Sequence, residues 1–139
     1  MTYLNVEIVT PNGLIYQNDK AKLVVVRTVE GDLGILPNHA PIIAPLKIDV
    51  VRIKAEVNAD EQDIMAINGG IMEVRDNQLT IIAESAETPE DIDIKRAERA
   101  KERAEELIQA AKSEHDVDQL KRAEVALNRA INRINVARH

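Results

Sequence analysis

Two stretches near the C-terminus each carry three arginines at intervals of three, four or seven residues. These arginines are Arg96, Arg99 and Arg103 in the first stretch and Arg122, Arg129 and Arg133 in the second. In an α-helix such intervals place each set on one stripe of the surface. Because the planar guanidinium group suits phosphate and carboxylate oxygens, two neighbouring stripes would form an anion site or a docking face for an acidic partner.

A solvated helix face with ion pairs between residues three or four apart is the plainer interpretation. The first stretch fits it, because Glu102 and Glu106 follow Arg99 and Arg103 at the right interval. The second stretch does not, because Arg129 and Arg133 have no carboxylate three or four residues away and repel each other. At this point the anion site and the solvated surface both stay open.

No other residue type forms a catalytic or metal-binding pattern. The three histidines are scattered, the chain has no cysteine, and neither Ser85 nor Ser113 lies in a nucleophile motif. A glycine-rich phosphate loop is also missing from the sequence. The residues therefore predict a protein that is not an enzyme and that needs no metal to fold.

The composition is that of a globular protein without a membrane span. Of the 139 residues 45% are hydrophobic and 30% are charged, and no run of about 18 apolar residues occurs. The net charge of −6 disfavours nucleic acid, and two tyrosines are the only aromatic residues on which a base could stack. The N-terminus shows no secretory signal, and the lack of cysteine fits a reducing compartment.

The elements that must position the arginines fall into two parts. All five glycines and all five prolines lie at or before residue 89. The first part, 1–87, alternates β-branched segments with turn signals such as Gly69-Gly70, which predicts an antiparallel β-sandwich. The segments expected to be strands are LNVEIV (4–9), LVVVRTV (23–29), IDVVRIKAEV (48–57), IMAI (64–67) and LTIIA (79–83).

The second part, 88–139, has the pattern of an antiparallel two-helix hairpin. Thr88 is the expected N-cap of the first helix, and Pro89 is suited to the first helical position after it. Small apolar residues recur every three or four positions on both sides of Ser113–Asp116, where cap-type residues predict the turn. Alanine buries little area, so we expect this hairpin to dock weakly and to open. The predicted fold class is α+β, a sandwich followed by a helical hairpin.

Long segments of the chain resemble one known family. GDLGILPNHAPIIAPL (31–46) and NGGIMEVRDNQLTIIAESAE (68–87) closely resemble the N-terminal β-sandwich of the epsilon subunit of bacterial F-type ATP synthase. DIDIKRAERAKERAEE (91–106) and KRAEVALNRAINRINVA (121–137) resemble the helical hairpin of the same family. The match runs nearly end to end.

This resemblance implies a rotor subunit in the central stalk of a proton-translocating ATP synthase, peripheral at the cytoplasmic face of the cell membrane. It implies that the sandwich binds the gamma subunit and the c ring, with His39 as a candidate contact. It also implies that the folded hairpin is permissive. The extended hairpin would lie along gamma, reach the alpha and beta subunits and inhibit ATP hydrolysis.

Some members of the family bind ATP on the folded hairpin through an Ile-Asp-x-x-Arg-Ala motif, and 92–97 matches it. The ATP-binding residues that the resemblance implies are Glu87, Ile92, Asp93, Arg96, Ala97, Arg103, Arg129 and Arg133. Arg99 and Arg122 would face solvent or serve the extended state. The alternatives are a structural rotor subunit without nucleotide binding, a free-standing ATP-sensing module, and an enzyme that uses the arginines for phosphoryl transfer.

Overall fold

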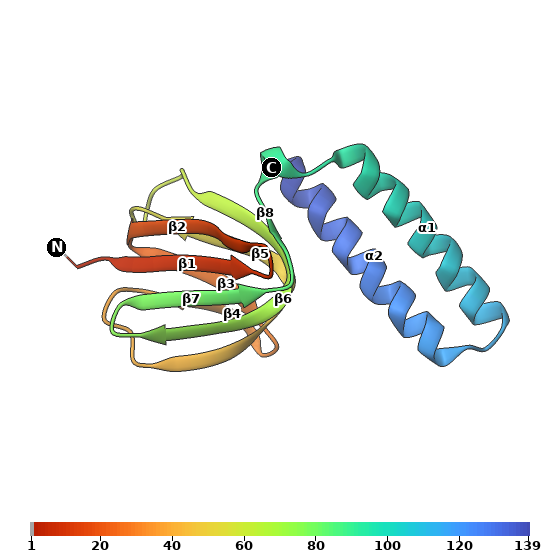
Figure 1. Cartoon of the computed structure of the whole chain (residues 1–139), viewed down its shortest axis with the longest axis horizontal. Helices are drawn as coiled ribbons and strands as arrows, with labels where there is room; N and C mark the ends of the chain where they lie inside the picture. The colour runs from red at the N-terminus through yellow and green to blue at the C-terminus, as the bar shows by residue number, and fades with distance from the viewer. Residues whose placement is uncertain (1) are drawn as a thin grey trace. The chain divides into compact units, whose positions relative to one another are not determined.

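The structure is a computed structural model that describes residues 2–139. It divides into two compact units, of which the first ends at Thr88 and the second spans Pro89–His139. The first unit is a β-sandwich and the second is a pair of helices (Figure 1). The predicted α+β fold is therefore confirmed.

The first unit consists of eight strands. They are β1 (Leu4–Thr10), β2 (Gly13–Ala21), β3 (Leu23–Thr28), β4 (Gly31–Ile35), β5 (Ile42–Lys54), β6 (Asp63–Arg75), β7 (Gln78–Ala83) and β8 (Ala86–Glu87). They hydrogen-bond in the order β2-β1-β7-β6-β5-β3-β4, with β8 beside β6. Every pairing is antiparallel except that of β1 with β7, which is parallel.

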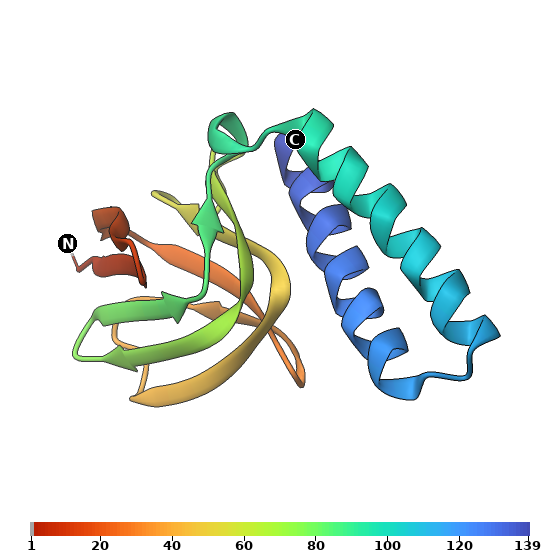
Figure 2. The same cartoon turned by 45° about the vertical axis from the view of Figure 1, so that its right-hand side comes forward.

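This single sheet folds over on itself to give the two layers of the sandwich (Figure 2). The long strands β5 and β6 pair with each other along nearly their whole length. The Tyr16 hydroxyl on β2 donates a hydrogen bond of 2.6 Å to Asp63 at the start of β6, although these strands are not neighbours in the sheet. Buried side chains from β1 to β7, among them Ile8, Val26 and Met72, form one common core.

The expected turn at Gly69-Gly70 is wrong, because both glycines lie inside β6. Their φ angles are +80° and +152°, values that side chains rarely allow. A Cβ atom on Gly70 would collide with the carbonyl oxygen of Ile82 on β7. The pair marks the place where β6 bends and β7 passes too close for a side chain, which is the other common meaning of glycine in a strand.

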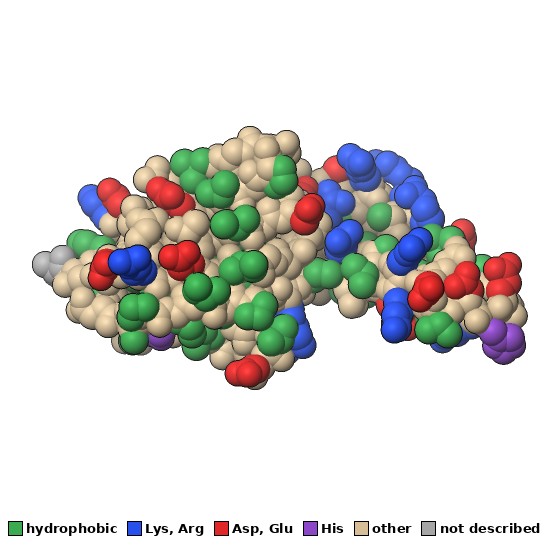
Figure 3. Space-filling view, turned by 60° about the horizontal axis from the view of Figure 1, so that its bottom comes forward, with side chains coloured by type: hydrophobic (Ala, Val, Ile, Leu, Met, Phe, Trp, Pro, Cys, Tyr) green, Lys and Arg blue, Asp and Glu red, His purple; other side chains and the backbone are tan. Residues whose placement is uncertain are grey.

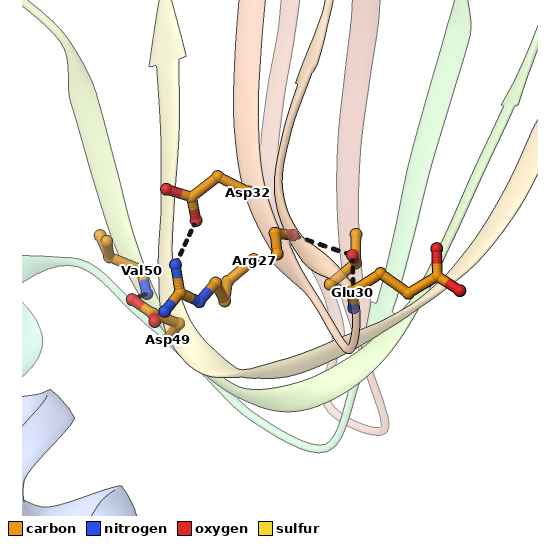
Figure 4. Close-up of polar contacts among 7 residues, drawn as sticks. Arg27, Glu30, Asp32, Asp49 and Val50 are labelled. Atoms are coloured by element: carbon orange, nitrogen blue, oxygen red, sulfur yellow. Dashed lines mark hydrogen bonds and ion pairs between the residues drawn. The ribbon is translucent and has the colours of Figure 1, made fainter.

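Polar contacts close the hairpin between β3 and β4 (Figure 4). Arg27 donates a hydrogen bond of 3.0 Å to Asp32, its partner in the register, and this bond raises the pKa of the Arg27 guanidinium. The Thr28 hydroxyl donates to the carbonyl of Gly31 at 2.8 Å and accepts from the amide of Glu30 at 3.1 Å. These bonds fix the shape of an otherwise exposed turn.

The second unit contains the 3-10 turn η1 (Pro89–Asp91) and the helices α1 (Ile94–Ser113) and α2 (Val117–Ala137). The predicted helix start at Thr88 and Pro89 is wrong, because that signal produces only η1. The α-helix begins after Asp93, whose carboxylate accepts a hydrogen bond from a main-chain amide of the first turn. No helix within residues 2–139 is long and apolar enough to cross a membrane.

The two helices pack through a seam of small side chains, as the sequence predicts. Its buried members are Ala97, Ala104 and Ala111 on α1 and Ala123, Ala130 and Ile134 on α2. Leu107 and Ile131 also follow the spacing of three or four residues that predicts the seam, but they are 39% and 37% exposed and lie at its edges. Alanine in these positions brings the helices close together while burying little apolar area.

Candidate functional site

The motif at 92–97 builds the start of α1. Asp93 is the N-cap, and its Oδ1 accepts a hydrogen bond of 3.1 Å from the amide of Arg96. Ile92 and Ala97, at the positions before the cap and four after it, are 7% and 0% exposed, as in a hydrophobic staple. Three motif residues thus have a structural role, while the Arg96 side chain is exposed.

Replacing Asp93 by alanine should destabilise the hairpin by about 1 kcal/mol, because the amide of Arg96 loses its acceptor. Asparagine should cost much less, since its side-chain oxygen accepts the same bond. Amide hydrogen exchange in the first turn of α1 measures both effects. Equal losses in the two variants would mean that the charge of Asp93, rather than its capping bond, stabilises the helix.

An ion pair at the open end of the hairpin shows how the two helices are aligned. Arg138 Nη2 lies 2.7 Å from Glu98 Oε1, across 40 residues of sequence. Arg103 lies five residues after Glu98 on α1, and Arg133 lies five residues before Arg138 on α2. Because the helices are antiparallel, the two arginines lie at the same level along the hairpin. Arg129 lies one helical turn from Arg133 on α2, in the direction of the turn between the helices.

A groove nearer the turn shows that both arginine stripes border the same flank of the hairpin. The groove has a volume of about 540 Å³, and Leu107 from α1 and Ala126 from α2 both line it. Arg103 precedes Leu107 by four residues, and Arg129 follows Ala126 by three, so each shares a helix face with a lining residue. Arg103, Arg129 and Arg133 therefore lie on the same flank of the hairpin, which we call the arginine flank, although none of them lines the groove itself.

Two of the three arginines on the arginine flank, Arg103 and Arg129, carry a charge that no ion pair offsets in the part of the chain that the structure describes. Arg99 and Arg103 do not form the ion pairs with Glu102 and Glu106 that the sequence allowed. Figure 3 shows lysine and arginine side chains gathered on one part of the hairpin. An anion with several oxygens would relieve this repulsion.

Two further predicted site residues lie in the first unit. Glu87 ends β8, is half-buried and pairs with Ala66 on β6. His39 lies in the loop between β4 and β5, where its Nδ1 is 2.5 Å from the carbonyl oxygen of Ala40. The loop is tied to the β6–β7 turn by two hydrogen bonds between Asn38 and Asn77, of 2.6 and 3.3 Å. The hairpin arginines belong to the other unit.

Sequence analysis missed a row of apolar residues across the outer face of the sandwich. The register aligns these residues on five adjacent strands, in the order Leu14, Val9, Ile82, Ile71 and Pro45. Leu14, Ile82 and Ile71 are 54%, 62% and 53% exposed. Ile43, two residues before Pro45 and therefore on the same face of β5, is 72% exposed. Contiguous exposed apolar surface of this kind usually marks a protein contact, and we call it the apolar row.

The described residues offer two surfaces that suit a binding partner. In the part of the chain that the structure describes, no group of three His, Cys, Asp or Glu side chains could hold a metal ion. The arginine flank suits a phosphate-bearing ligand, and the apolar row suits another protein.

The chain matches two family models that together cover nearly all of it. One describes the beta-sandwich domain of the ATP synthase delta/epsilon chain and matches residues 3–89. The other describes the long alpha-helix domain of the same chain and matches residues 90–138.

Curated relatives are similar over the same extent. The ATP synthase epsilon chain of Pediococcus pentosaceus is 52% identical over 136 residues, which are 98% of this chain and 96% of the relative. That of Levilactobacillus brevis is 54% identical over 136 residues, with 98% and 95% covered.

Solved structures share the fold at lower identity. A chain in the mitochondrial ATP synthase of Euglena gracilis superposes with a TM-score of 0.79 at 23% identity, over 100% of this chain and 83% of that one. A chain in the central stalk and c ring of the Tetrahymena thermophila mitochondrial ATP synthase superposes with a TM-score of 0.54 at 17% identity, over 66% of this chain and 72% of that one.

Proposed function

The chain belongs to the family of ATP synthase epsilon chains, subunits of the central stalk, and on this premise we propose how its two units work. The sandwich joins the gamma subunit to the c ring, so that the chain turns with the rotor and couples rotation to proton flow. The hairpin regulates ATP hydrolysis and catalyses nothing itself. The chain is peripheral at the cytoplasmic face of the cell membrane and is held there by the complex.

The apolar row is the observation that carries the docking proposal. It crosses five strands, and its isoleucines are more than half exposed in the isolated chain. A rotor subunit must bind its neighbour tightly enough to transmit torque, and a contiguous apolar surface provides such binding. We assign the row to the gamma subunit. The loop with His39 contributes to contact with gamma or the c ring.

Replacing Ile71 and Ile82 by threonine should weaken binding to purified gamma subunit roughly thirtyfold, because each substitution removes about 1 kcal/mol of apolar contact. Threonine keeps the β-branched shape, so the strands should remain intact. Surface plasmon resonance with immobilised gamma measures the change.

Val29 and Val57 provide the matched control, because they are exposed valines outside the row, at 58% and 46%. A variant with both replaced by threonine should bind gamma like the natural chain. Unchanged binding by the isoleucine variant would remove the apolar row from the interface. No binding of gamma by the natural chain would favour a free-standing module instead.

The arginine flank carries the regulatory proposal. ATP binds there to the folded hairpin, with phosphate oxygens on Arg103, Arg129 and Arg133, and with the 92–97 motif towards the adenosine end. A ligand that binds only the folded state stabilises it by RT ln(1 + [ATP]/Kd), about 1.4 kcal/mol at ten times Kd. That shift changes the ratio of folded to extended hairpin about elevenfold.

The consequence for the enzyme follows from this shift in population. At high ATP the hairpin stays folded and rotation is free in both directions. At low ATP the helices extend along gamma towards the alpha and beta subunits and block wasteful hydrolysis. A structural subunit without nucleotide binding is the second candidate. It is favoured by the structural roles that Ile92, Asp93 and Ala97 already have at the start of α1.

A further inference from the structure

The turn between α1 and α2 depends on one residue in an unusual conformation. Three residues, Glu114, His115 and Asp116, connect the helices. His115 has a φ of +56°, in the left-handed region that favours glycine. For other side chains this region is disfavoured about five- to thirtyfold. Glu114 is in the right-handed region and Asp116 is extended, and both conformations are ordinary.

The hydrogen bonds around His115 form a complete helix-ending motif. The amide of Asp116 donates to the carbonyl of Ala111 at 2.9 Å, and the amide of His115 donates to that of Lys112 at 3.3 Å. This is the Schellman pattern, in which the left-handed position is usually glycine. Asp116 then caps α2 by accepting a hydrogen bond of 3.1 Å from the amide of Gln119. The turn is therefore well bonded and strained only at His115.

Apart from these two residues, nothing in the sequence interrupts a helix from α1 to α2. The last fifty residues contain neither glycine nor proline. If His115 turned to a negative φ and Asp116 became helical, the carbonyl groups of Ala111 and Lys112 would still accept hydrogen bonds, now in the regular pattern of an α-helix. A single helix over 94–137 would replace the hairpin.

We propose that His115 is the hinge of the hairpin, and that its left-handed conformation biases the hairpin towards one continuous helix. The inference rests on the proposed function in one respect, since it explains how the regulatory hairpin opens. The closed form is held by the alanine seam and the exposed pair between Glu98 and Arg138, neither of which contributes much. Strain at one residue is therefore large enough to change the ratio of hairpin to continuous helix.

The full-length chain allows a direct distance measurement, because it has no cysteine of its own. Cysteines in place of Lys95 and Asn135, both exposed, carry spin labels near the open end of the hairpin. In the hairpin the labels lie on neighbouring helix ends. In a continuous helix they are 40 residues apart, about 60 Å. Pulsed electron paramagnetic resonance resolves the two distances and their populations.

The substitution His115→Gly should lower the ratio of continuous helix to hairpin about tenfold, because glycine relaxes the turn and disfavours the helix. His115→Ala should raise that ratio roughly fivefold, because alanine does the opposite. The matched control is Asn128→Gly, an exposed position that is helical in both forms, which should leave the ratio unchanged. A distance distribution that is the same for the natural chain and both His115 variants would overturn the proposal.

The measurement works without ATP or the gamma subunit, and repeating it with each of them added separates the hinge from the proposed function. Populations that follow the residue at 115 in a chain that ignores ATP and gamma would keep the hinge and overturn the function. Populations that respond to ATP but not to the residue at 115 would keep the function and overturn the hinge.

Discussion

A chain in which both Arg103 and Arg133 are alanine should bind ATP at least about a hundredfold more weakly than the natural chain. The two arginines lie at one level on opposite helices, so one polyphosphate can contact both. Each hydrogen bond to a charged group contributes about 1.5–3 kcal/mol, and the double substitution removes at least two of them. Isothermal titration calorimetry of the full-length chain measures the loss.

The control removes the same amount of charge from the same two helices. Arg99 and Arg122 are exposed, and both are expected to stay out of contact with the nucleotide. Their double alanine variant should keep the affinity within a few-fold. Equal losses in the two double variants would reduce the site to unspecific attraction by positive charge. No heat from the natural chain up to millimolar ATP would assign the arginine flank to protein docking and favour the purely structural subunit.

The substitution Gly70→Ala should destabilise the β-sandwich by about 3 kcal/mol or more. The new Cβ would meet the main chain of Ile82 and Ala83 on β7, which cannot move away without breaking the β6–β7 pairing. The φ of +152° adds strain that relaxation of neighbouring side chains cannot relieve. Urea denaturation followed by circular dichroism gives the free energy of unfolding.

Gly34 on β4 offers the matched substitution. It has no positive φ, and a Cβ there would lie 3.6 Å from Leu23 Cδ1, an ordinary contact. Gly34→Ala should therefore change the free energy of unfolding by less than about 1 kcal/mol. If Gly70→Ala were as mild as Gly34→Ala, the bend in β6 would not depend on the absence of a side chain.

Periodicity in the sequence was enough to predict the sandwich, the hairpin and most of the alanine seam. It missed β2 because GLIYQNDKA alternates poorly and has few β-branched residues, and its strand form depends on pairing with β1. It also missed the first half of β5, where Pro45 discourages a strand prediction. At the start of α1 two cap signals competed, and the later one at Asp93 begins the α-helix.

The two surfaces differ in how far the sequence could reveal them. Each arginine stripe follows from helical spacing within one segment. Their meeting on one flank depends on the alignment of the two helices, which is visible in the pair between Arg138 and Glu98, and no motif singled out either residue. The apolar row depends on the register of five strands, and its members are far apart in the sequence. Only the apolar run of Ile81 and Ile82, on both faces of β7, gave a local sign of it.

The parallel pairing of β1 with β7 has a consequence for the order of folding. β1 cannot gain its second neighbour until about seventy more residues have been made, because Val6 pairs with Leu79 and Ile8 with Ile81. Contacts between such distant residues slow folding, whereas the two helices make mostly local contacts. During synthesis we expect the β7-facing edge of β1 to remain unpaired until β7 leaves the ribosome. A chain stalled while β7 is still inside the ribosome should be prone to aggregate, while one stalled after β8 has emerged should already contain a folded sandwich.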